Sequence, residues 1–236
     1  VNLVEFADGP TIIAAMESGS IDVGYIGQGA HKLCVNGQAK IFALSHISNG
    51  DALIGGPGFT KVEDLKGKKI RVQQSPASVE MVKAFGAAAA PMGFGEVYTA
   101  IQQGVIDGAE NNELALTNNK HGEVAKYYAY NKHQMVPDML VANLKFLQGL
   151  DPEEYQVFKD AALLSTQVVM EEWDKSIEAA KQIASEDIGV EFIDVDVDAF
   201  KQKVLPLHEK MLKENPKIAD LYLYIQEVNE KAKGGQ

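Results

Sequence analysis

Arg71 is the residue of this sequence whose type and position point most clearly to chemistry. It is the one arginine among 22 basic residues. The alternation in Lys69-Ile70-Arg71-Val72 predicts a strand, which places the arginine on the face opposite Ile70 and Val72. A guanidinium binds a carboxylate through two parallel N–H donors, which lysine cannot do. Two interpretations remain open: a carboxylate-binding group, or a surface arginine paired with a local acid.

The remaining reactive residue types form no recognisable catalytic or metal-binding pattern. The chain has one cysteine, no G-x-S-x-G motif and no histidines at metal-ligand spacing. Gly27-Gln28-Gly29-Ala30 follows a predicted strand and could hold an anion, but the rest of a dinucleotide fingerprint is missing. Asp194, Asp196 and Asp198 lack the glycine and glutamate of a calcium loop. We therefore expect no catalytic residue, metal or cofactor, and a protein that is not an enzyme.

Composition and charge argue against a disordered protein, a nucleic-acid-binding protein and a membrane-spanning protein. With 46% hydrophobic and 23% charged residues, the chain of 236 residues can bury a core. A net charge of −11 with scattered lysines argues against nucleic acid as a partner. No apolar run approaches the roughly 20 residues that span a bilayer, so we do not expect a membrane-spanning protein. The sequence opens without a signal-peptide pattern, so either no signal existed or it has been removed.

The first half of the chain alternates between strand-like and helix-like segments, as expected of an α/β protein. We predict strands over residues 1–6, 21–26, 39–46 and 69–74, and helices over 10–18, 28–37 and near 77–88. Glycine, proline and asparagine crowd into residues 49–58, which predicts a crossing segment or hinge.

A short internal repeat suggests two similar lobes. Residues 15–22 and 100–107 share alanine, glycine, isoleucine and aspartate at the same four of eight positions. Each copy predicts a helix that ends at a glycine and leads into a strand. The alternative is chance similarity between two unrelated turns of this kind.

The second half predicts one very long helix. Asp151-Pro152-Glu153-Glu154 combines an N-cap, a first-turn proline and acidic first-turn residues. Apolar residues then recur at helical spacing, so a helix from 152 to about 185 would be roughly 50 Å long. Such a helix is expected to lie across both lobes. A strand over 189–194 and helices over 197–213 and 217–232 complete the chain.

From about Val62 to the C-terminus, the sequence resembles the solute-binding proteins of TRAP (tripartite ATP-independent periplasmic) transporters. Three stretches carry the resemblance, in family order and at family spacing. They are Asp64-Leu65-Lys66-Gly67-Lys68-Lys69-Ile70-Arg71-Val72, Pro91-Met92-Gly93-Phe94-Gly95-Glu96-Val97-Tyr98-Thr99-Ala100 and Gly104-Val105-Ile106-Asp107-Gly108-Ala109-Glu110-Asn111-Asn112. The resemblance implies a type II periplasmic-binding-protein-like fold. Such proteins have two Rossmann-like α/β lobes, a hinge and a long C-terminal helix bracing both.

The resemblance also implies roles for particular residues. In the family, the arginine at the position of Arg71 forms a salt bridge to the ligand carboxylate. Phe94 would contact the ligand, Asn111 would donate to it, and Gln74 would lie at the cleft. The variant Glu110-Asn111-Asn112 resembles the subset that binds sugar acids such as uronates.

Residues 1–56 are more similar to ABC-transporter binding proteins of the nitrate, sulfonate and thiamine-precursor type. That likeness would place Asp8, Gly9, Tyr25, Gln28 and Gly29 around the cleft. Where TRAP proteins usually carry a second arginine, the chain reads Asn49-Gly50-Asp51-Ala52. A chimera of two binding-protein lineages is therefore one hypothesis. The comparison with the family also predicts that its first strand and helix are absent, which would leave the first lobe incomplete.

The leading hypothesis is an extracytoplasmic protein that captures a small organic acid, such as a sugar acid, for a TRAP-type secondary transporter. Its partners would be the small carboxylate and membrane permease subunits. It would be periplasmic, or an extracytoplasmic lipoprotein in a Gram-positive source. The alternatives are a recombinant chimera without a physiological ligand and an ABC-type binding protein. The expected units are residues 1–56 with about 126–150 as lobe 1, and 57–125 with about 190–215 as lobe 2. The spanning helix would cover 151–189, and a closing helix 216–236.

Overall fold

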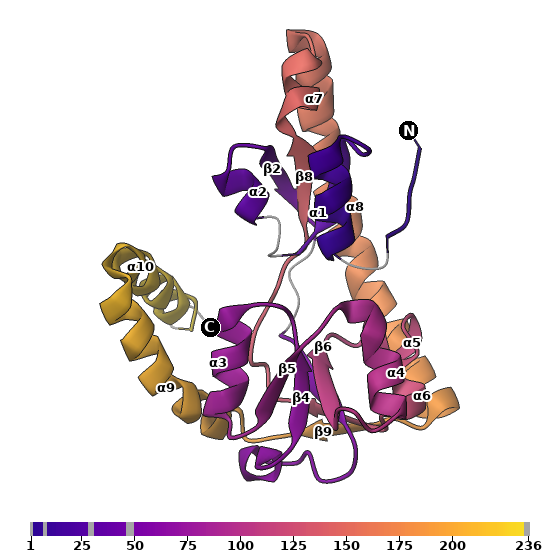
Figure 1. Cartoon of the computed structure of the whole chain (residues 1–236), viewed down its shortest axis with the longest axis vertical. Coiled ribbons are helices and arrows are strands. Elements are labelled where there is room, and N and C mark those ends of the chain that lie inside the picture. The colour runs from indigo at the N-terminus through magenta and orange to yellow at the C-terminus, as the bar shows by residue number, and fades with distance from the viewer. Residues whose placement is uncertain (1, 7–8, 28–30, 46–49, 234–236) are drawn as a thin grey trace.

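The chain forms two β-sheets joined by a long helix (Figure 1). The computed structural model describes residues 2–6, 9–27, 31–45 and 50–233. In the three-stranded sheet, β8 (Met139–Asn143) lies between β1 (Val23–Ile26) and β2 (Ala39–Leu44) and is antiparallel to both. The six-stranded sheet has the order β5-β4-β6-β3-β7-β9. Its strands are β3 (Ala52–Gly55), β4 (Lys69–Val72), β5 (Ala88–Pro91), β6 (Gly108–Asn111), β7 (Tyr127–Tyr130) and β9 (Glu191–Asp194).

The shorter helices gather around one sheet or the other. In the upper part of Figure 1, α1 (Gly9–Ser18), α2 (His31–Val35) and α7 (Leu144–Gly149) lie near the three-stranded sheet. The six-stranded sheet is accompanied by α3 (Pro76–Ala84), α4 (Val97–Gln102), α5 (Leu114–Thr117) and α6 (His121–Val124). The chain ends in α9 (Val197–Glu214) and α10 (Pro216–Lys233). Short 3-10 turns cover Val62–Leu65 and Phe94–Glu96.

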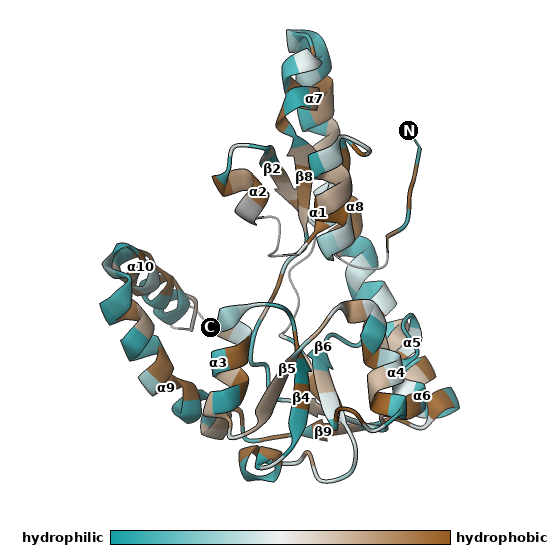
Figure 2. Ribbon diagram, in the orientation of Figure 1, coloured by the Kyte–Doolittle hydropathy of each residue, from teal (hydrophilic) through white to brown (hydrophobic). Residues whose placement is uncertain are grey.

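The predicted long helix is confirmed as α8 (Pro152–Ile183), which continues into a π-helical turn over Ala184–Ile188. Asp151 caps it, accepting hydrogen bonds from the backbone N–H groups of Glu153 and Glu154. Hydrophilic and hydrophobic residues are mixed along α8, α9 and α10 (Figure 2).

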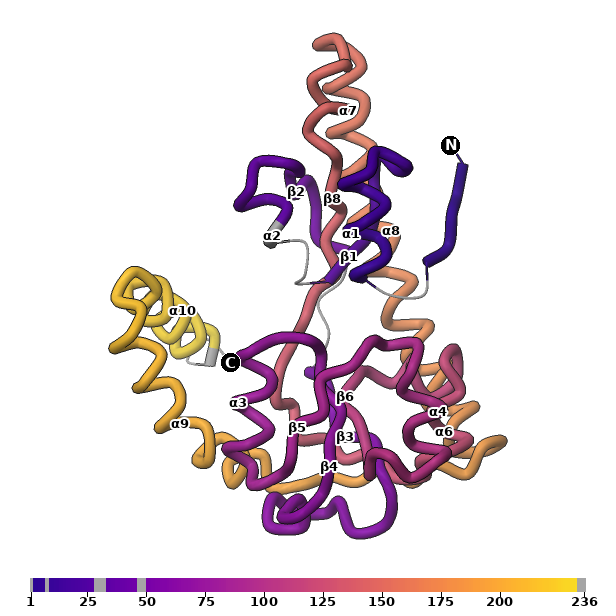
Figure 3. Tube along the Cα trace, viewed as in Figure 1, coloured from indigo at the N-terminus to yellow at the C-terminus, as the bar shows by residue number. Residues whose placement is uncertain are grey.

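Helix α8 contacts both sheets. Near its start, Phe158 packs edge-on to Phe42 of β2 at 4.8 Å between ring centroids. Farther along, the Thr166 hydroxyl donates to the Leu44 carbonyl oxygen at 2.7 Å. Just after its end, Ala184 is fully buried in a core cluster with Tyr128 of β7. The helix therefore braces the two sheets, as the trace in Figure 3 also shows.

Both copies of the short repeat form a helix, a glycine and a strand. Gly19 lies between α1 and β1 with a φ of 75°, and Gly104 lies between α4 and β6 with a φ of 68°. A glycine adopts this left-handed conformation without the steric penalty that a Cβ atom brings. The predicted turn is thus confirmed in each part of the molecule.

The structure corrects two sequence-based expectations. Residues 2–6 form no strand, and Leu3 is 94% exposed. Residues 1–56 and about 126–150 were expected in one lobe, yet β3 and β7 from these ranges pair with β6 and β9 in the six-stranded sheet, apart from β1, β2 and β8. A strand pairs where its apolar residues become buried in the correct register, and this depends on the whole fold. All four residues of β3 are buried in the six-stranded sheet. Among the described residues, no helix is both long and apolar enough to cross a membrane.

Candidate functional site

The candidate site lies at one edge of the six-stranded sheet. Strands β4, β6 and β7 run in the same direction and end at this edge, and the antiparallel strand β3 begins there. The chain passes from β2 to β3 and from β7 to β8 at this edge, so two of the three crossings between the sheets leave from it, and the third runs from β8 through α7 and α8 to β9. Side chains that follow these strands are thereby brought together next to the crossings.

Arg71 lies buried at this edge, with only 4% of its surface exposed. Its Nε and Nη2 donate to the Met92 carbonyl oxygen at 3.2 and 3.1 Å. Its Nη1 donates to Oε1 of Glu110 at 3.4 Å, and its guanidinium lies 5.5 Å from the centre of the Phe94 ring. These bonds engage three of the five N–H groups of the guanidinium. The 3.4 Å contact is long for a charge-assisted hydrogen bond, which is ordinarily about 2.7–2.9 Å.

Glu110 connects Arg71 to the second crossing between the sheets. This carboxylate is 1% exposed and accepts from Nε2 of Gln134 at 2.7 Å. His133 Nε2 lies 3.9 Å from the same carboxylate oxygen, Oε2. Because Gln134 and His133 lie between β7 and β8, the partner of Arg71 is tied to a segment that joins the two sheets.

Asp51 supplies a second buried carboxyl group, 6% exposed, on the other crossing. Its backbone N–H donates to the Gln134 carbonyl oxygen at 2.7 Å. Burial, together with the charge of Glu110, raises the pKa of Asp51 to about 7, although His133 and Gln134 oppose this rise. Burial also lowers the pKa of Arg71, and the charge of Glu110 opposes that shift.

His121 lies behind the aromatic ring of Phe94. It is 1% exposed and edge-on to Phe94, with ring centroids 5.3 Å apart. Burial, followed by the positive charge of Arg71, lowers the pKa of His121 to about 4. The imidazole is therefore neutral at pH 7 and adds no second cation to the site.

Asn111 and Asn112 present amide groups at the end of β6. The side-chain oxygen of Asn111 accepts from the Asn112 backbone at 2.8 Å, and that of Asn112 accepts from the Leu114 backbone at 3.1 Å. The Tyr128 hydroxyl donates to the Asn111 carbonyl oxygen at 3.0 Å. With both side-chain oxygens engaged, the two NH₂ groups are the donors that these residues can offer a ligand.

The structure brings together some of the predicted site residues and separates others. Arg71 contacts both Glu110 and Phe94, and Asn111 and Asn112 lie at the end of the strand that carries Glu110. Gln74 is exposed just after β4.

The residues predicted from the N-terminal segment lie elsewhere or cannot be placed. Tyr25 belongs to β1 in the other sheet, where its hydroxyl donates to Ser165 of α8 at 2.9 Å. Asp8, Gln28 and Gly29 lie outside the described residues.

Sequence reasoning missed four members of this cluster, namely Asp51, His121, His133 and Gln134. Each is separated by tens of residues from Arg71, and only the pairing of distant strands brings it near. The one available signal was the position of Asp51 in the glycine-rich segment.

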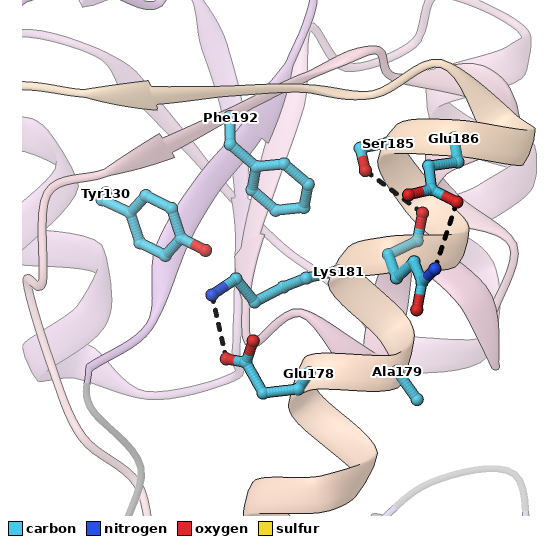
Figure 4. Close-up of a pocket in the computed structure, with 8 residues that line it drawn as sticks. Tyr130, Glu178, Ala179, Lys181, Ser185, Glu186 and Phe192 are labelled. Carbon is cyan, nitrogen blue, oxygen red and sulfur yellow. Dashed lines mark hydrogen bonds and ion pairs between the residues drawn. The ribbon is translucent and has the colours of Figure 1, made fainter.

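Two concavities lie away from the Arg71 side chain. A groove of about 730 Å³ separates Tyr130 and Phe192 from the end of α8, where Glu178 and Lys181 line it (Figure 4). The Tyr130 hydroxyl donates to Glu113 at 3.1 Å, which links this groove to the strand end after β6. A second, largely apolar groove of about 550 Å³ lies between α3, α9 and α10, and residues 131–134 of the crossing after β7 also line it. Arg71 lines neither groove.

The arrangement favours binding rather than covalent chemistry. It combines one buried guanidinium, amide donors and two buried carboxyl groups that can accept hydrogen bonds. In the part of the chain that the structure describes, no three histidine, cysteine or acidic side chains are grouped to hold a metal ion. These groups suit a small polar molecule that carries a carboxylate.

The sequence matches the family described as DctP, bacterial extracellular solute-binding protein family 7, over residues 27–215. Among curated proteins, it is 36% identical to the uncharacterized protein YiiZ of Salmonella typhimurium over 219 residues, which is 93% of this chain. It is 33% identical over 171 residues to the 2,3-diketo-L-gulonate-binding periplasmic protein YiaO of Escherichia coli, covering 70% of this chain and 51% of that protein. The chain spans 62% of the length of YiiZ.

Solved structures share the fold. A TRAP periplasmic solute-binding protein from Anaerococcus prevotii, with bound D-glucuronate, superposes with a TM-score of 0.86 at 35% identity, covering 95% of this chain and 84% of that one. A second TRAP periplasmic solute-binding protein, from Xanthobacter autotrophicus with bound β-D-galacturonate, gives a TM-score of 0.84 at 29% identity. The superposition covers 93% of this chain and 85% of the X. autotrophicus chain.

The comparisons do not support the hypothesis of a chimera with an ABC-type binding protein. The alignment with YiiZ covers 219 of the 236 residues, so 17 remain outside it. Most of residues 1–56 must therefore lie within it. In addition, β1 and β2 of this segment pair with β8 from much later in the chain, and β3 pairs with β6 and β7, so the segment forms sheets together with the rest of the chain. The chain belongs to the DctP family, family 7 of the bacterial extracellular solute-binding proteins.

Proposed function

We propose that the protein is an extracytoplasmic solute-binding protein that captures a small sugar acid or similar carboxylate for a TRAP-type secondary transporter. The observation that carries the proposal is the buried guanidinium of Arg71 at the strand ends, with two N–H groups free of the bonds to Met92 and Glu110. Relatives support the ligand class, because similar proteins hold D-glucuronate, and the E. coli relative is named for binding 2,3-diketo-L-gulonate. An ectoine-binding protein of Halomonas elongata is also related.

In this proposal the ligand carboxylate binds the outer N–H groups of Arg71. Asn111 and Asn112 donate to the ligand's other oxygens, and Phe94 packs against its ring. Gln74 and Glu110 contribute polar contacts, while Tyr25 and the residues beyond the described ranges (Asp8, Gln28 and Gly29) remain predictions from the sequence. Water is excluded when the two sheets close on the ligand, and closure follows from the ligand's greater affinity for the closed state.

In this proposal the protein binds its ligand without changing it and is not an enzyme. It would work in the periplasm, or as an extracytoplasmic lipoprotein in a Gram-positive cell, and hand its ligand to membrane permease subunits. The two sheets and their helices form the two lobes in this proposal. The crossings before β3 and after β7 form the hinge, and α8 braces both lobes.

Calorimetry of wild type and Arg71→Lys tests the proposal. D-Glucuronate should bind the wild type and lose about 10- to 100-fold in affinity in the variant, because an ammonium cannot replace a bidentate guanidinium contact worth about 1.5–3 kcal/mol. Lys83→Gln serves as the control, since Lys83 is an exposed cation paired with Glu80 at 2.9 Å on α3. Equal affinity in wild type and Arg71→Lys would contradict the role of Arg71. A wild type that melts cooperatively and binds no carboxylate of a broad panel would contradict the function.

A further inference from the structure

The groove between α3, α9 and α10 has apolar walls that remain partly exposed. Phe85 at the end of α3 packs edge-on to Phe200 of α9, with ring centroids 5.2 Å apart, and both rings line the groove. From α10, Ile218, Leu221 and Ile225 recur at helical spacing and also line it, yet they are 41, 57 and 47% exposed. An apolar occupant that removes such surface from water lowers the free energy. The groove therefore suits a ligand with an apolar body.

The charged residues that line this groove, within the part of the chain that the structure describes, are two lysines. Lys132 comes from the crossing after β7 and Lys201 from α9, and His133 and His208 line the groove as well. Both lysines are exposed, and neither forms an ion pair with a described residue. The acidic side chains described on α3, α9 and α10 do not line the groove. Although the whole chain carries a charge of −11, this groove is locally positive and complements an anion.

The crossing after β7, which lines the groove, contains polar atoms without a partner. Asn131 Nδ2 and His133 Nε2 are buried and form no hydrogen bond within the described structure, and the same is true of His208 Nδ1 on α9. Buried polar atoms ordinarily have a hydrogen-bond partner. Because the amide NH₂ of Asn131 can only donate, a ligand that brings acceptor oxygens suits this groove better than a purely apolar one.

We propose that the groove is a second binding site, which takes an amphipathic carboxylate. The apolar chain of the ligand lies against α3, α9 and α10, and its carboxylate faces Lys132 and Lys201. The volume of about 550 Å³ falls within the roughly 300–1,000 Å³ of small-molecule sites. A medium-chain fatty acid is the simplest ligand of this class. Arg71 does not line the groove, so this site is separate from that of the proposed function and does not depend on it.

Three ligands with the same carbon chain and different head groups test the role of charge. Calorimetry on the full chain should show one site for decanoate. Decanol should bind about three- to tenfold more weakly and decylamine more weakly still, because each exposed lysine adds a modest attraction for an anion. Lys201→Gln should weaken decanoate binding about threefold and leave decanol binding unchanged. Lys203→Gln is the matched control, because Lys203 is also exposed on α9 but does not line the groove.

A second pair of variants locates the ligand. Leu221→Glu places a negative charge in the apolar wall of α10 and should weaken decanoate binding at least about tenfold. Leu223→Glu is its control, since Leu223 is 64% exposed on the same helix and does not line the groove. Both positions are exposed, so both variants should fold, and D-glucuronate should bind them as it binds the wild type.

A wild type that binds no decanoate overturns the inference, as does decanoate binding that Lys201→Gln and Leu221→Glu change no more than their controls do. Equal affinity for decanoate and decylamine would show apolar adsorption without a site for an anion, and also overturns it. Sedimentation of the same samples checks for another occupant. A wild-type dimer that Leu221→Glu dissociates would assign the groove to a second copy of the chain and contradict the inference. If decanoate binds as expected and D-glucuronate does not, the proposed function fails and this inference stands.

Discussion

At the scale of single residues, the aromatic ring of Phe94 separates a cation from a neutral histidine. The guanidinium of Arg71 lies 5.5 Å from the ring centre, and His121 meets the same ring edge-on at 5.3 Å. His121 is buried, and its Nδ1 has no hydrogen-bond partner among the described residues. A protonated imidazole here would place a second positive charge near Arg71 in a site of low dielectric.

This arrangement predicts how stability depends on pH. The pKa of His121 is about 4 in the folded state and near 6.5 in the unfolded state, so the unfolded chain binds more protons between these values. The free energy of unfolding should rise as pH increases from 4 to 6.5, by up to about 1.4 kcal/mol per pH unit from this residue. His121→Gln lacks this contribution. Urea unfolding of both proteins between pH 4 and 7 measures their free energies of unfolding, and the value for wild type should rise relative to that of the variant as pH increases. If the two free energies change with pH in parallel, the lowered pKa of His121 is contradicted.

The sequence indicated part of the site at this scale. Arg71 stood out because it is the single arginine in the chain and lies in a strand. Its partner Glu110 was expected near the ligand because of a resemblance to a known family, not because an ion pair could be foreseen. Asp51 and Gln134 were not predicted, because burial and hydrogen bonds between two separate crossings give them their importance.

At the scale of elements, α8 is the clearest case in which local signals determine structure. Its N-terminus combines the Asp151 cap with a reciprocal bond from the Asp151 N–H to the Glu154 carboxylate at 2.9 Å. Because α8 contacts both sheets, a loss at its first turn should lower the stability of the whole protein rather than fray one end.

Asp151→Ala should therefore cost about 1 kcal/mol in the free energy of unfolding, within the usual range of about 0.5–2 kcal/mol for an N-cap. Asp160→Ala is the control, since Asp160 is exposed in the same helix and bonds only Gln156 in its own turn. Chemical denaturation of the two variants makes the comparison. A loss in Asp151→Ala no larger than that in Asp160→Ala would show that the cap is unimportant.

The elements that sequence reasoning misjudged depend on distant partners. Residues 2–6 have a strand-like composition but form no strand in the described structure. Strands β3 and β7 are short, and their place in the six-stranded sheet follows from pairing with each other and with β6 and β9. Four-residue strands carry too little periodicity to reveal which sheet buries them.

At the scale of the whole molecule, the net charge of −11 opposes the approach of an anionic ligand. In the proposed function, capture therefore depends on Arg71 and the amide donors near it, not on long-range attraction. Helix α8, which contacts both sheets, and the bond from Gln134 of the crossing after β7 to Glu110 set the geometry of that local site.

This balance predicts an unusual dependence on salt. Raising the ionic strength from 10 to 150 mM shortens the Debye length from about 30 to about 8 Å and screens the repulsion. The association rate of D-glucuronate should therefore increase several-fold, as measured by stopped-flow fluorescence of the single tryptophan, Trp173. A rate that decreases with salt would show that positive potential near the site outweighs the net charge.

A crystal structure of the protein grown with D-glucuronate tests whether Arg71 binds the ligand, because it locates the ligand carboxylate. We predict a carboxylate within about 3 Å of Nη1 and Nη2 of Arg71, between the ends of β4 and β6. Glucuronate bound elsewhere, for example in the groove between α3, α9 and α10, with Arg71 still bonded only to Met92 and Glu110, would contradict it.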